Sequence, residues 1–406
     1  MASQARFDFT FLPDLRDMHP RSADAQSGFL EYQLPSRHSL RLGPLSRGDL
    51  NGIDVFVCLV RHLYNHLPIK WRDDAEIRQE DMKNPVLRFS WSDFGRSENC
   101  VRAQDSIRED IVHLLRGDFG VANFSFLGLA ECPLMHQTLF KREPFQLYDP
   151  NPISQKIVAR GPGEDQEADK IWDAEDGRKE PAEMAKRSLI VWHGQKELGA
   201  FISDKFGVFE NSQTSMRYYF YSGRPAFIRV HYHAPAANAP NFTHLREILI
   251  DGKGLYPREG TTSTFDIANK EQKMARYVLI AVIRLGEASI GEDPDLIRRY
   301  TLDGKEVITP RDFRYSDDSW RLGEPGRQYM LFYCDAPDTL PAGIRLPEVL
   351  RMPKDFEERI RNASAVVKMA AAREAAREAG QEGPSGSSNQ RSSFGNLGQH
   401  EVTRRG

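Results

Sequence analysis

The chain has 406 residues, of which 40% are hydrophobic, so it is long enough to bury one large core or two ordinary ones. Its formal net charge of -3 excludes a global positive field that would hold it on nucleic acid or on an anionic membrane, and no apolar run approaches the ~20 residues that span a bilayer. We therefore expect neither a nucleic-acid partner nor a membrane partner.

Residues 1–47 are rich in Pro, Arg and Ser, and we expect them to form an N-terminal arm. Their first segment, MASQARFDFTFLPDL, lacks the pattern of a secretory signal, which favours the cytosol or the nucleus. In residues 50–68, leucines recur every four residues behind a short apolar run, and this spacing predicts a helix whose N-terminus lies near Cys58. A second helix is predicted from Asp105, because Asp105 and Ser106 can cap it.

The second half of the chain differs from the first in its composition and in its pattern of apolar residues. Residues 160–187 carry many charges and few apolar residues, which predicts a charged flexible insertion. Beyond it, short apolar runs bounded by Gly, Pro, Asn or Asp are typical of strands: SLIVWHG, MRYYFYSG, PAFIRVHYHA, REILID, RYVLIAVIRLG and QYMLFYC. Helices followed by strands predict an α+β fold. Residues 353–380 are predicted to form a charged Ala-rich helix and residues 381–406 a disordered tail.

The common catalytic motifs are missing: GxxxxGK[ST], GxGxxG after a strand, HExxH and GxSxG. The four cysteines form no CxxC pair, which favours free thiols over a disulfide framework or a zinc site. His231 and His233 point to one face of a predicted strand and could supply two metal ligands, but no third ligand is evident. We therefore expect a structural pair, with no metal and no cofactor. Asp317, just before Trp320, is either a carboxylate site or a solvated turn.

Several segments occur in a recognisable order. DVFVCLVRHLYNHLP is followed by AQDSIREDIVHLL, then by RPAFIRVHYHA and FTHLREILID, and finally by YVLIAVIRLG, LIRRYTLDGKEV, YSDDSW and QYMLFYC. This order resembles that of the ubiquitin-specific protease family, whose papain-like fold is a hand with a helical thumb and a β-rich palm and fingers. The resemblance covers roughly residues 48–336, and it implies a protease-like domain over residues 48–340.

The resemblance places Cys58 at the family's nucleophile and Asp317 at the acid that orients its histidine. The family's histidine lies in a Gly-His-Tyr motif, and counting back from Tyr300 puts Leu296 at that position. Residues 53–56 stand where the family carries the Asn and Gly residues of its oxyanion hole, and the CxxC zinc knuckles of many members are missing. Because leucine cannot accept a proton, the resemblance implies that no residue of this chain is catalytic.

The leading hypothesis is a catalytically degenerate, ubiquitin-specific-protease-like binding or scaffold protein. Its partner would be another protein, with ubiquitin or a ubiquitin-like protein as the candidates. One alternative is an active cysteine deubiquitinase that uses Cys58. Its base would be one of four histidines: His62, His231, His233 or His244. The other alternative is an unrelated interaction protein that acts through its C-terminal helix. A free thiol at a helix N-terminus is activated by the helix dipole, whereas a buried cysteine is a small hydrophobe.

Overall fold

The computed structural model describes most of the first unit of the chain, Met1–Met352, and none of the second, Pro353–Gly406. The described residues are 14, 16, 34–35, 47–67, 71, 74–92, 94, 98–149, 153–156, 171–174, 180–211, 213, 216–253, 256–257, 264–266, 274–286, 293–307 and 319–336. The predicted helix at 353–380, the predicted tail at 381–406 and Asp317 lie outside them. So does most of the predicted arm, apart from a few residues. Of these, Arg16 donates a hydrogen bond to Asp81 at 2.7 Å.

The central helix of the first half is α3 (Arg47–His66), which starts well before Cys58. The prediction of a helix beginning near Cys58 was therefore wrong. Buried apolar residues continue at helical spacing towards the N-terminus, through Ile53 to Leu50, so packing extends the helix in that direction. Gly52 permits this, because a Cβ atom there would lie 2.0 Å from the carbonyl oxygen of Phe124. Cys58 is thus an interior residue of α3.

Further helices surround α3: α5 (Ala75–Asp81), α6 (Pro85–Ser90), α7 (Glu98–Gly117), α8 (Phe126–Ala130), α9 (Pro133–Thr138) and the 3-10 helix η2 (Glu143–Phe145). The side chain of Asn84 caps α6 by accepting hydrogen bonds from two backbone N–H groups of its first turn. Helix α7 begins at Glu98, so the prediction of a start at Asp105 was also wrong. Asp105 is instead buried inside α7, where it is ion-paired to Arg108.

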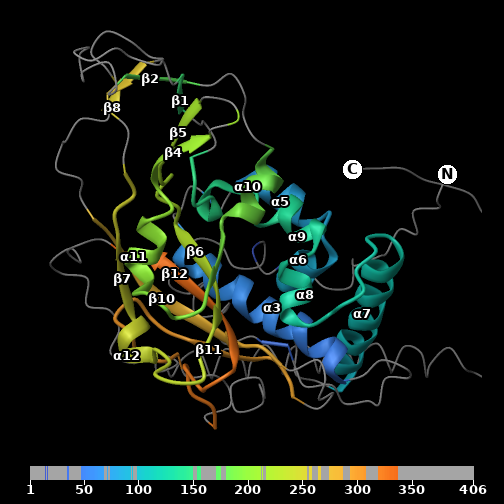
Figure 1. Ribbon diagram of the computed structural model, residues 1–406. Helices are drawn as coiled ribbons and strands as arrows, with labels where there is room; N and C mark the ends of the chain where they lie inside the picture. The colour runs from blue at the N-terminus through green and yellow to red at the C-terminus, as the bar shows by residue number, and fades with distance from the viewer. Residues whose placement is uncertain are drawn as a thin grey trace, which may run out of the picture. The chain divides into compact units, whose positions relative to one another are not determined.

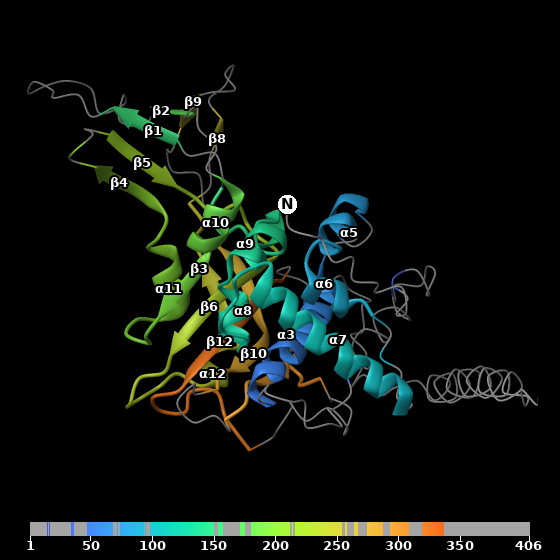
Figure 2. The same ribbon diagram turned by 90° about the vertical axis from the view of Figure 1, so that its right-hand side faces the viewer.

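The larger sheet has the strand order β11-β10-β12-β6-β3, and β7 also pairs with β10. Its strands are β3 (Leu189–Trp192), β6 (Phe227–His233), β7 (Glu247–Ile250), β10 (Ala275–Arg284), β11 (Leu296–Arg299) and β12 (Gln328–Asp335). All pairs are antiparallel except β3 with β6. Figures 1 and 2 show α3 and its neighbours on one face, and α11 (Leu198–Ser203) and α12 (Phe242–Leu245) on the other. Each face has its own hydrophobic core.

The second sheet has the order β4-β5-β1-β2-β9-β8 and lies at the top of Figures 1 and 2. Its strands are β1 (Ile153–Lys156), β2 (Ile171–Ala174), β4 (Gly207–Asn211), β5 (Met216–Phe220), β8 (Tyr256–Pro257) and β9 (Thr264–Asp266). All six apolar runs predicted as strands contain strands of one sheet or the other, and the α+β class is confirmed. Among the described residues, no helix combines the length and the apolar character needed to cross a membrane.

The predicted flexible insertion at 160–187 differs from the structure. Residues 171–174 form β2, and its last residues form α10 (Pro181–Arg187). The side chains of Met184 and Ala185 are buried. The burial of these two neighbouring apolar side chains is enough to hold one short helix against the core. The insertion was therefore predicted to extend too far, and residues 160–170 and 175–179 lie outside the described part of the chain.

Candidate functional site

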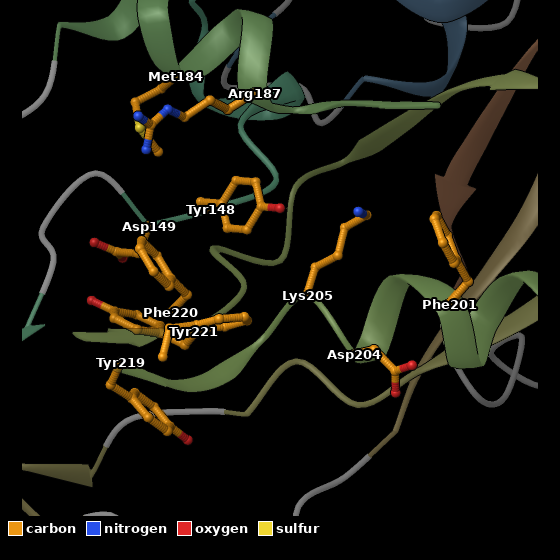
Figure 3. A pocket seen from close by; sticks show the side chains of 11 residues that line it. Tyr148, Asp149, Met184, Arg187, Phe201, Asp204, Lys205, Tyr219, Phe220 and Tyr221 are labelled. Carbon is orange, nitrogen blue, oxygen red and sulfur yellow. The ribbon is translucent and has the colours of Figure 1, made fainter. Parts of the chain in front are cut away.

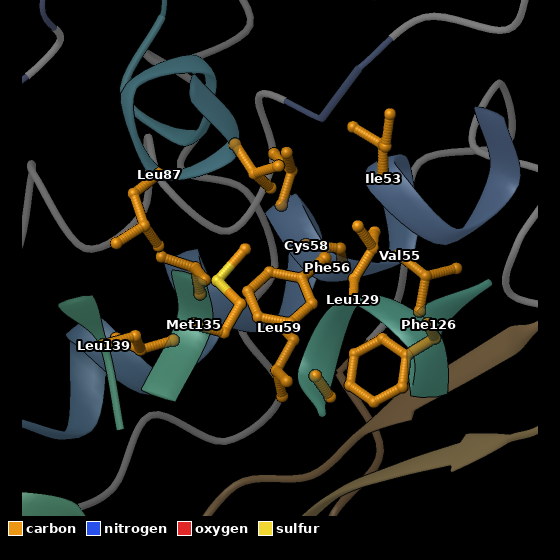
Figure 4. Packing of buried hydrophobic residues seen from close by; sticks show 14 of the residues in the cluster. Ile53, Val55, Phe56, Cys58, Leu59, Leu87, Phe126, Leu129, Met135 and Leu139 are labelled. Atoms are coloured by element: carbon orange, nitrogen blue, oxygen red, sulfur yellow. The ribbon is translucent and has the colours of Figure 1, made fainter. Parts of the chain in front are cut away.

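Cys58 lies in the hydrophobic core that α3 shares with its neighbouring helices and the larger sheet, and 0% of its surface is exposed. Figure 4 shows it among the buried side chains of Val55, Phe56 and Leu59. The effect of the helix dipole is confined to the first and last turns, so a mid-helix position gives the thiolate no such support. Cys58 therefore has the surroundings of a small core residue rather than those of an accessible nucleophile.

Leu296 is the first residue of β11 and is also buried. Its side chain belongs to the core on the sheet face opposite α3, whereas the neighbouring Ile297 belongs to the core that contains Cys58. Successive side chains of a strand point to opposite faces. The structure therefore does not bring Leu296 and Cys58 together in one site. Asp317, the third residue of the expected constellation, lies outside the described residues.

Helix α3 packs on the larger sheet near Ile280. Ile280 of β10 shares the core with Cys58, and the Ile280 carbonyl accepts two hydrogen bonds from other elements. One comes from Nε2 of His62 at 2.9 Å, and the other from the backbone N–H of Tyr300 at 2.6 Å. The β10 register against β12 shifts at this point, which frees that carbonyl from the ladder. Because a carbonyl only accepts, Nε2 of His62 carries the proton.

The other histidines considered as bases or ligands are placed as follows. His231 and His233 do share one face of β6, with ring centroids 4.3 Å apart, and Nε2 of His231 lies 3.0 Å from Oε1 of Gln328. The ring of His193 is tilted against that of His233, with their centroids 4.7 Å apart. His244 lies on α12, where its Nδ1 is 2.8 Å from Oδ1 of Asn241. No group of three or more potential ligands that could hold a metal ion occurs among the described residues.

A buried carboxylate, Asp295, precedes Leu296. It accepts hydrogen bonds from the backbone N–H groups of Phe126 at 2.7 Å and Gly286 at 2.9 Å. Burial raises its pKa, although these two hydrogen bonds oppose the shift. Asp295 thus ties the start of α8 to the ends of β10 and β11. Both of its carboxylate oxygens therefore accept hydrogen bonds that hold these elements together.

His136 of α9 predicts a pH dependence of stability. Burial lowers the pKa of His136 to about 4, and the Arg229 guanidinium acts in the same direction. The pKa of His136 in the folded protein lies below its unfolded value of about 6.5. Between these two pKa values the unfolded chain binds more protons than the folded protein, so stability falls as the pH is lowered. Going from pH 7 to pH 5 should cost about 2 kcal/mol of unfolding free energy through this residue. Urea unfolding should show a weaker pH dependence for His136→Gln, and an unchanged dependence would contradict this.

A cavity of about 500 Å³ lies where α10 and α11 meet the first strands of the second sheet (Figure 3). Its walls are mainly aromatic, and the aromatic lining residues are Tyr148, Phe201, Phe209, Tyr219, Phe220 and Tyr221. Four charged residues line it as well: Asp149, Arg187, Asp204 and Lys205. This volume and this mixture of apolar walls with a few polar groups are typical of ligand-binding sites, which range over about 300–1,000 Å³.

The charges of the cavity are unevenly neutralised. Asp204 is ion-paired to Lys196, and Asp149 accepts a hydrogen bond from the Tyr221 hydroxyl, which together with burial raises the pKa of Tyr221. The Nζ of Lys205 instead lies 4.6 Å from the ring centroid of Phe201. Among the described residues, the one ion contact of Arg187 is a long one, 3.9 Å from Glu183. The two carboxylates thus have close partners, while the two cations keep most of their charge available.

This cavity was not predicted from the sequence. Its lining residues come from segments near 148, 184, 201 and 220, which no local spacing relates. One signal was present in MRYYFYSG, where aromatic residues occupy successive positions of a strand and so lie on both of its faces. A strand that needs apolar side chains on only one face would alternate, and the extra aromatic residues indicate a second buried surface.

Comparisons with known proteins give a coarse structural likeness only. No protein-family model matches the sequence, and no curated relative matches it. Among solved structures, the chain is similar to a Ubp8/Sgf11/Sus1/Sgf73 DUB module of SAGA bound to ubiquitin aldehyde, with 10% identity, a TM-score of 0.37, and coverage of 75% of this chain and 71% of that one. Another structure of that module gives 9% identity, a TM-score of 0.34, and coverage of 74% and 70%.

The chain is also similar to the Saccharomyces cerevisiae Pan2 pseudoubiquitin hydrolase-RNA exonuclease module in complex with RNA. The identity is 10% and the TM-score 0.23, over 71% of this chain and 48% of that one. All three TM-scores lie below 0.5. None of these similarities therefore establishes a relationship, and the α+β architecture is what the structure itself establishes.

Proposed function

We propose that this chain is a non-catalytic protein-binding module that keeps a ubiquitin-hydrolase-like scaffold. The burial of Cys58 carries the proposal. A nucleophile must approach the carbonyl it attacks to about 3–3.5 Å, and a thiol enclosed by core side chains in mid-helix offers no such approach. Without an accessible thiol, the scaffold retains its shape and surfaces but not the chemistry of a cysteine hydrolase.

Two further observations support this proposal. Leu296, at the position of the family's base, is apolar and packs on the opposite face of the sheet. Residues 53–56, at the position of the oxyanion hole, lie inside α3 beyond its first turn. Backbone N–H groups in a helix interior donate to the carbonyl four residues earlier, so they cannot donate to an oxyanion. The scaffold would thus lack a base and oxyanion donors as well as an accessible thiol.

The proposed partner is another protein, with ubiquitin or a ubiquitin-like protein as the first candidates, met in the cytosol or nucleus. The aromatic cavity beside α11 supports a binding role, because it offers apolar area together with groups that can fix the orientation of a ligand. Nucleic acid is a less suitable partner, since a net charge of -3 provides no overall attraction to phosphate.

An active cysteine hydrolase is the second candidate. One observation favours it: His62 follows Cys58 by one helical turn, which places the two residues on the same side of α3. However, His62 is as deeply buried as Cys58, and its Nε2 donates to the sheet backbone. A base in that position could not reach the leaving amine of a protein substrate.

Turnover of a ubiquitin fluorogenic amide tests the proposal. We expect the rate with the wild-type chain to equal that with Cys58→Ala, because the thiol does not meet the substrate. Leu296→His should not raise the rate, since the new imidazole would lie in a different core from Cys58 and no oxyanion donors are present. Turnover that Cys58→Ala abolishes would contradict the proposal and support the hydrolase.

A further inference from the structure

We propose that the aromatic cavity binds a large apolar side chain of an extended acidic peptide segment, presented by a partner protein and running along β4. This rests on the proposed binding function and specifies where and by what chemistry the partner is held. The proposal follows from the shape of the cavity, from the balance of its charges and from the exposed strand at its rim.

The cavity walls suit an apolar side chain. Phe209 and Phe220 lie on one face of the second sheet with their ring centroids 5.4 Å apart, and Tyr148 lies 6.2 Å from Phe220. Edge-to-face contacts of this kind leave ring faces and edges available to a further aromatic or branched side chain. Phe209 is 42% exposed, so the aromatic lining continues from the cavity to the surface.

The charges at the cavity favour an acidic ligand. Lys205 makes no ion pair with a described residue, and its ammonium rests over the Phe201 ring. The contact between Arg187 and Glu183 is long and lies at an exposed site, where an ion pair is worth at most about 1 kcal/mol. A carboxylate placed between Arg187 and Lys205 would gain attraction from both cations, whereas a basic ligand would be repelled.

The strand at the rim favours an extended peptide over a small molecule. Among the described strands, β4 pairs only with β5 and is the end strand of its sheet. The outer N–H and C=O groups of an end strand are available to an added strand. Val208 lies on the face of β4 opposite to that of Phe209 and is 51% exposed, so apolar surface continues beyond the cavity. An added strand would place alternate side chains on the Phe209 face and the Val208 face.

Selection from a phage-displayed library of short random peptides on the immobilised full chain tests this. We expect enrichment of sequences with an aromatic or branched apolar residue flanked by Asp or Glu. The most enriched peptide should bind Phe209→Asp and Lys205→Glu at least about tenfold more weakly than the wild-type chain. Replacing its acidic residues by lysine should restore binding to Lys205→Glu, because the charges are then exchanged across the contact.

Val191→Asp is the matched control, since Val191 is an apolar strand residue with 45% exposure that does not line the cavity. It should change the affinity by less than about twofold. Thermal unfolding of each variant verifies the fold. If Phe209→Asp is unfolded, the affinities of Lys205→Glu for the original and the charge-exchanged peptide still test the proposal, because this substitution alters only a side chain at the cavity wall.

The proposal is overturned by a library that yields no enriched motif, by a basic motif, or by equal affinity for the wild type and Lys205→Glu. Binding of 2-naphthoate in the cavity without any enriched peptide would assign the cavity to a small anion and overturn it as well. These failures are distinct from failure of the proposed function. Thiol-dependent turnover would contradict the non-catalytic assignment and leave the peptide motif and its charge exchange unchanged.

Discussion

Replacing Cys58 with aspartate is expected to lower the free energy of unfolding by about 4 kcal/mol at pH 7, because burial raises the pKa of a carboxyl group by up to about 3–5 units and the folded protein then binds a proton that the unfolded chain, with a pKa about 3 units below pH 7, has released. The new side chain would enter the core between α3 and the sheet, which is formed by residues such as Phe56 and Ile280. Part of the loss should be recovered on going to pH 5, since the raised pKa lets the folded protein bind the proton there. Urea unfolding followed by circular dichroism measures both effects.

Two variants control this prediction. Cys58→Ala should cost only about 1–2 kcal/mol, because it removes one buried atom without adding a charge. Cys100→Asp, at a partly exposed position in the first turn of α7, should change stability by less than about 1 kcal/mol. A surface nucleophile would tolerate aspartate and lose only activity. Wild-type stability of Cys58→Asp would therefore place Cys58 at an accessible site.

Arg108→Met is expected to lower the free energy of unfolding by about 3–5 kcal/mol, because it leaves two buried carboxylates without their shared cation. Nε of Arg108 lies 2.8 Å from Oδ1 of Asp54, and its Nη1 lies 2.9 Å from Oδ1 of Asp105. All three side chains are inaccessible to solvent. The group joins α3 to α7, so chemical unfolding should show the loss as a lower denaturation midpoint with an unchanged slope.

The triple variant Arg108→Met, Asp54→Leu, Asp105→Leu is the matched control. An apolar set of similar volume in place of a buried ionic group is often neutral or stabilising, so the triple variant should recover most of the stability lost by Arg108→Met. Equal instability of the single and triple variants would show that Arg108 contributes by filling space rather than by neutralising the two carboxylates.

The strands could be predicted from the sequence because each is a short apolar run with polar or Gly and Pro boundaries. Such runs have few alternatives to a buried strand. Helix starts were predicted too late for a different reason. The short apolar run before Cys58 suggested that the helix begins after it, yet Gly52 allows α3 to begin earlier and to lie against the backbone at Phe124. Asp105 suggests an N-cap, yet it serves an ion pair inside α7. Tertiary contacts determine where α3 and α7 begin, and the local sequence does not reveal these contacts.

The candidate sites show the same limit. The placing of Cys58 at a helix N-terminus depended on the predicted start of that helix, and it failed because α3 begins at Arg47. The cavity could not be predicted, because Met184 and Arg187 were assigned to a flexible insertion and the remaining walls come from distant segments. Burial and convergence are properties of the folded chain, so only the structure could reveal that the thiol is enclosed and the aromatic site is open.

Reaction of the native chain with ubiquitin carrying a C-terminal electrophile, read by mass spectrometry, tests whether the Cys58 thiol is enclosed. We expect no adduct at Cys58 in the folded protein, because its side chain has no exposed surface. Iodoacetamide should modify Cys58 once the chain is unfolded in concentrated urea, which verifies that the thiol itself is intact. Stoichiometric adduct formation by the native chain that is lost in Cys58→Ala would contradict the account.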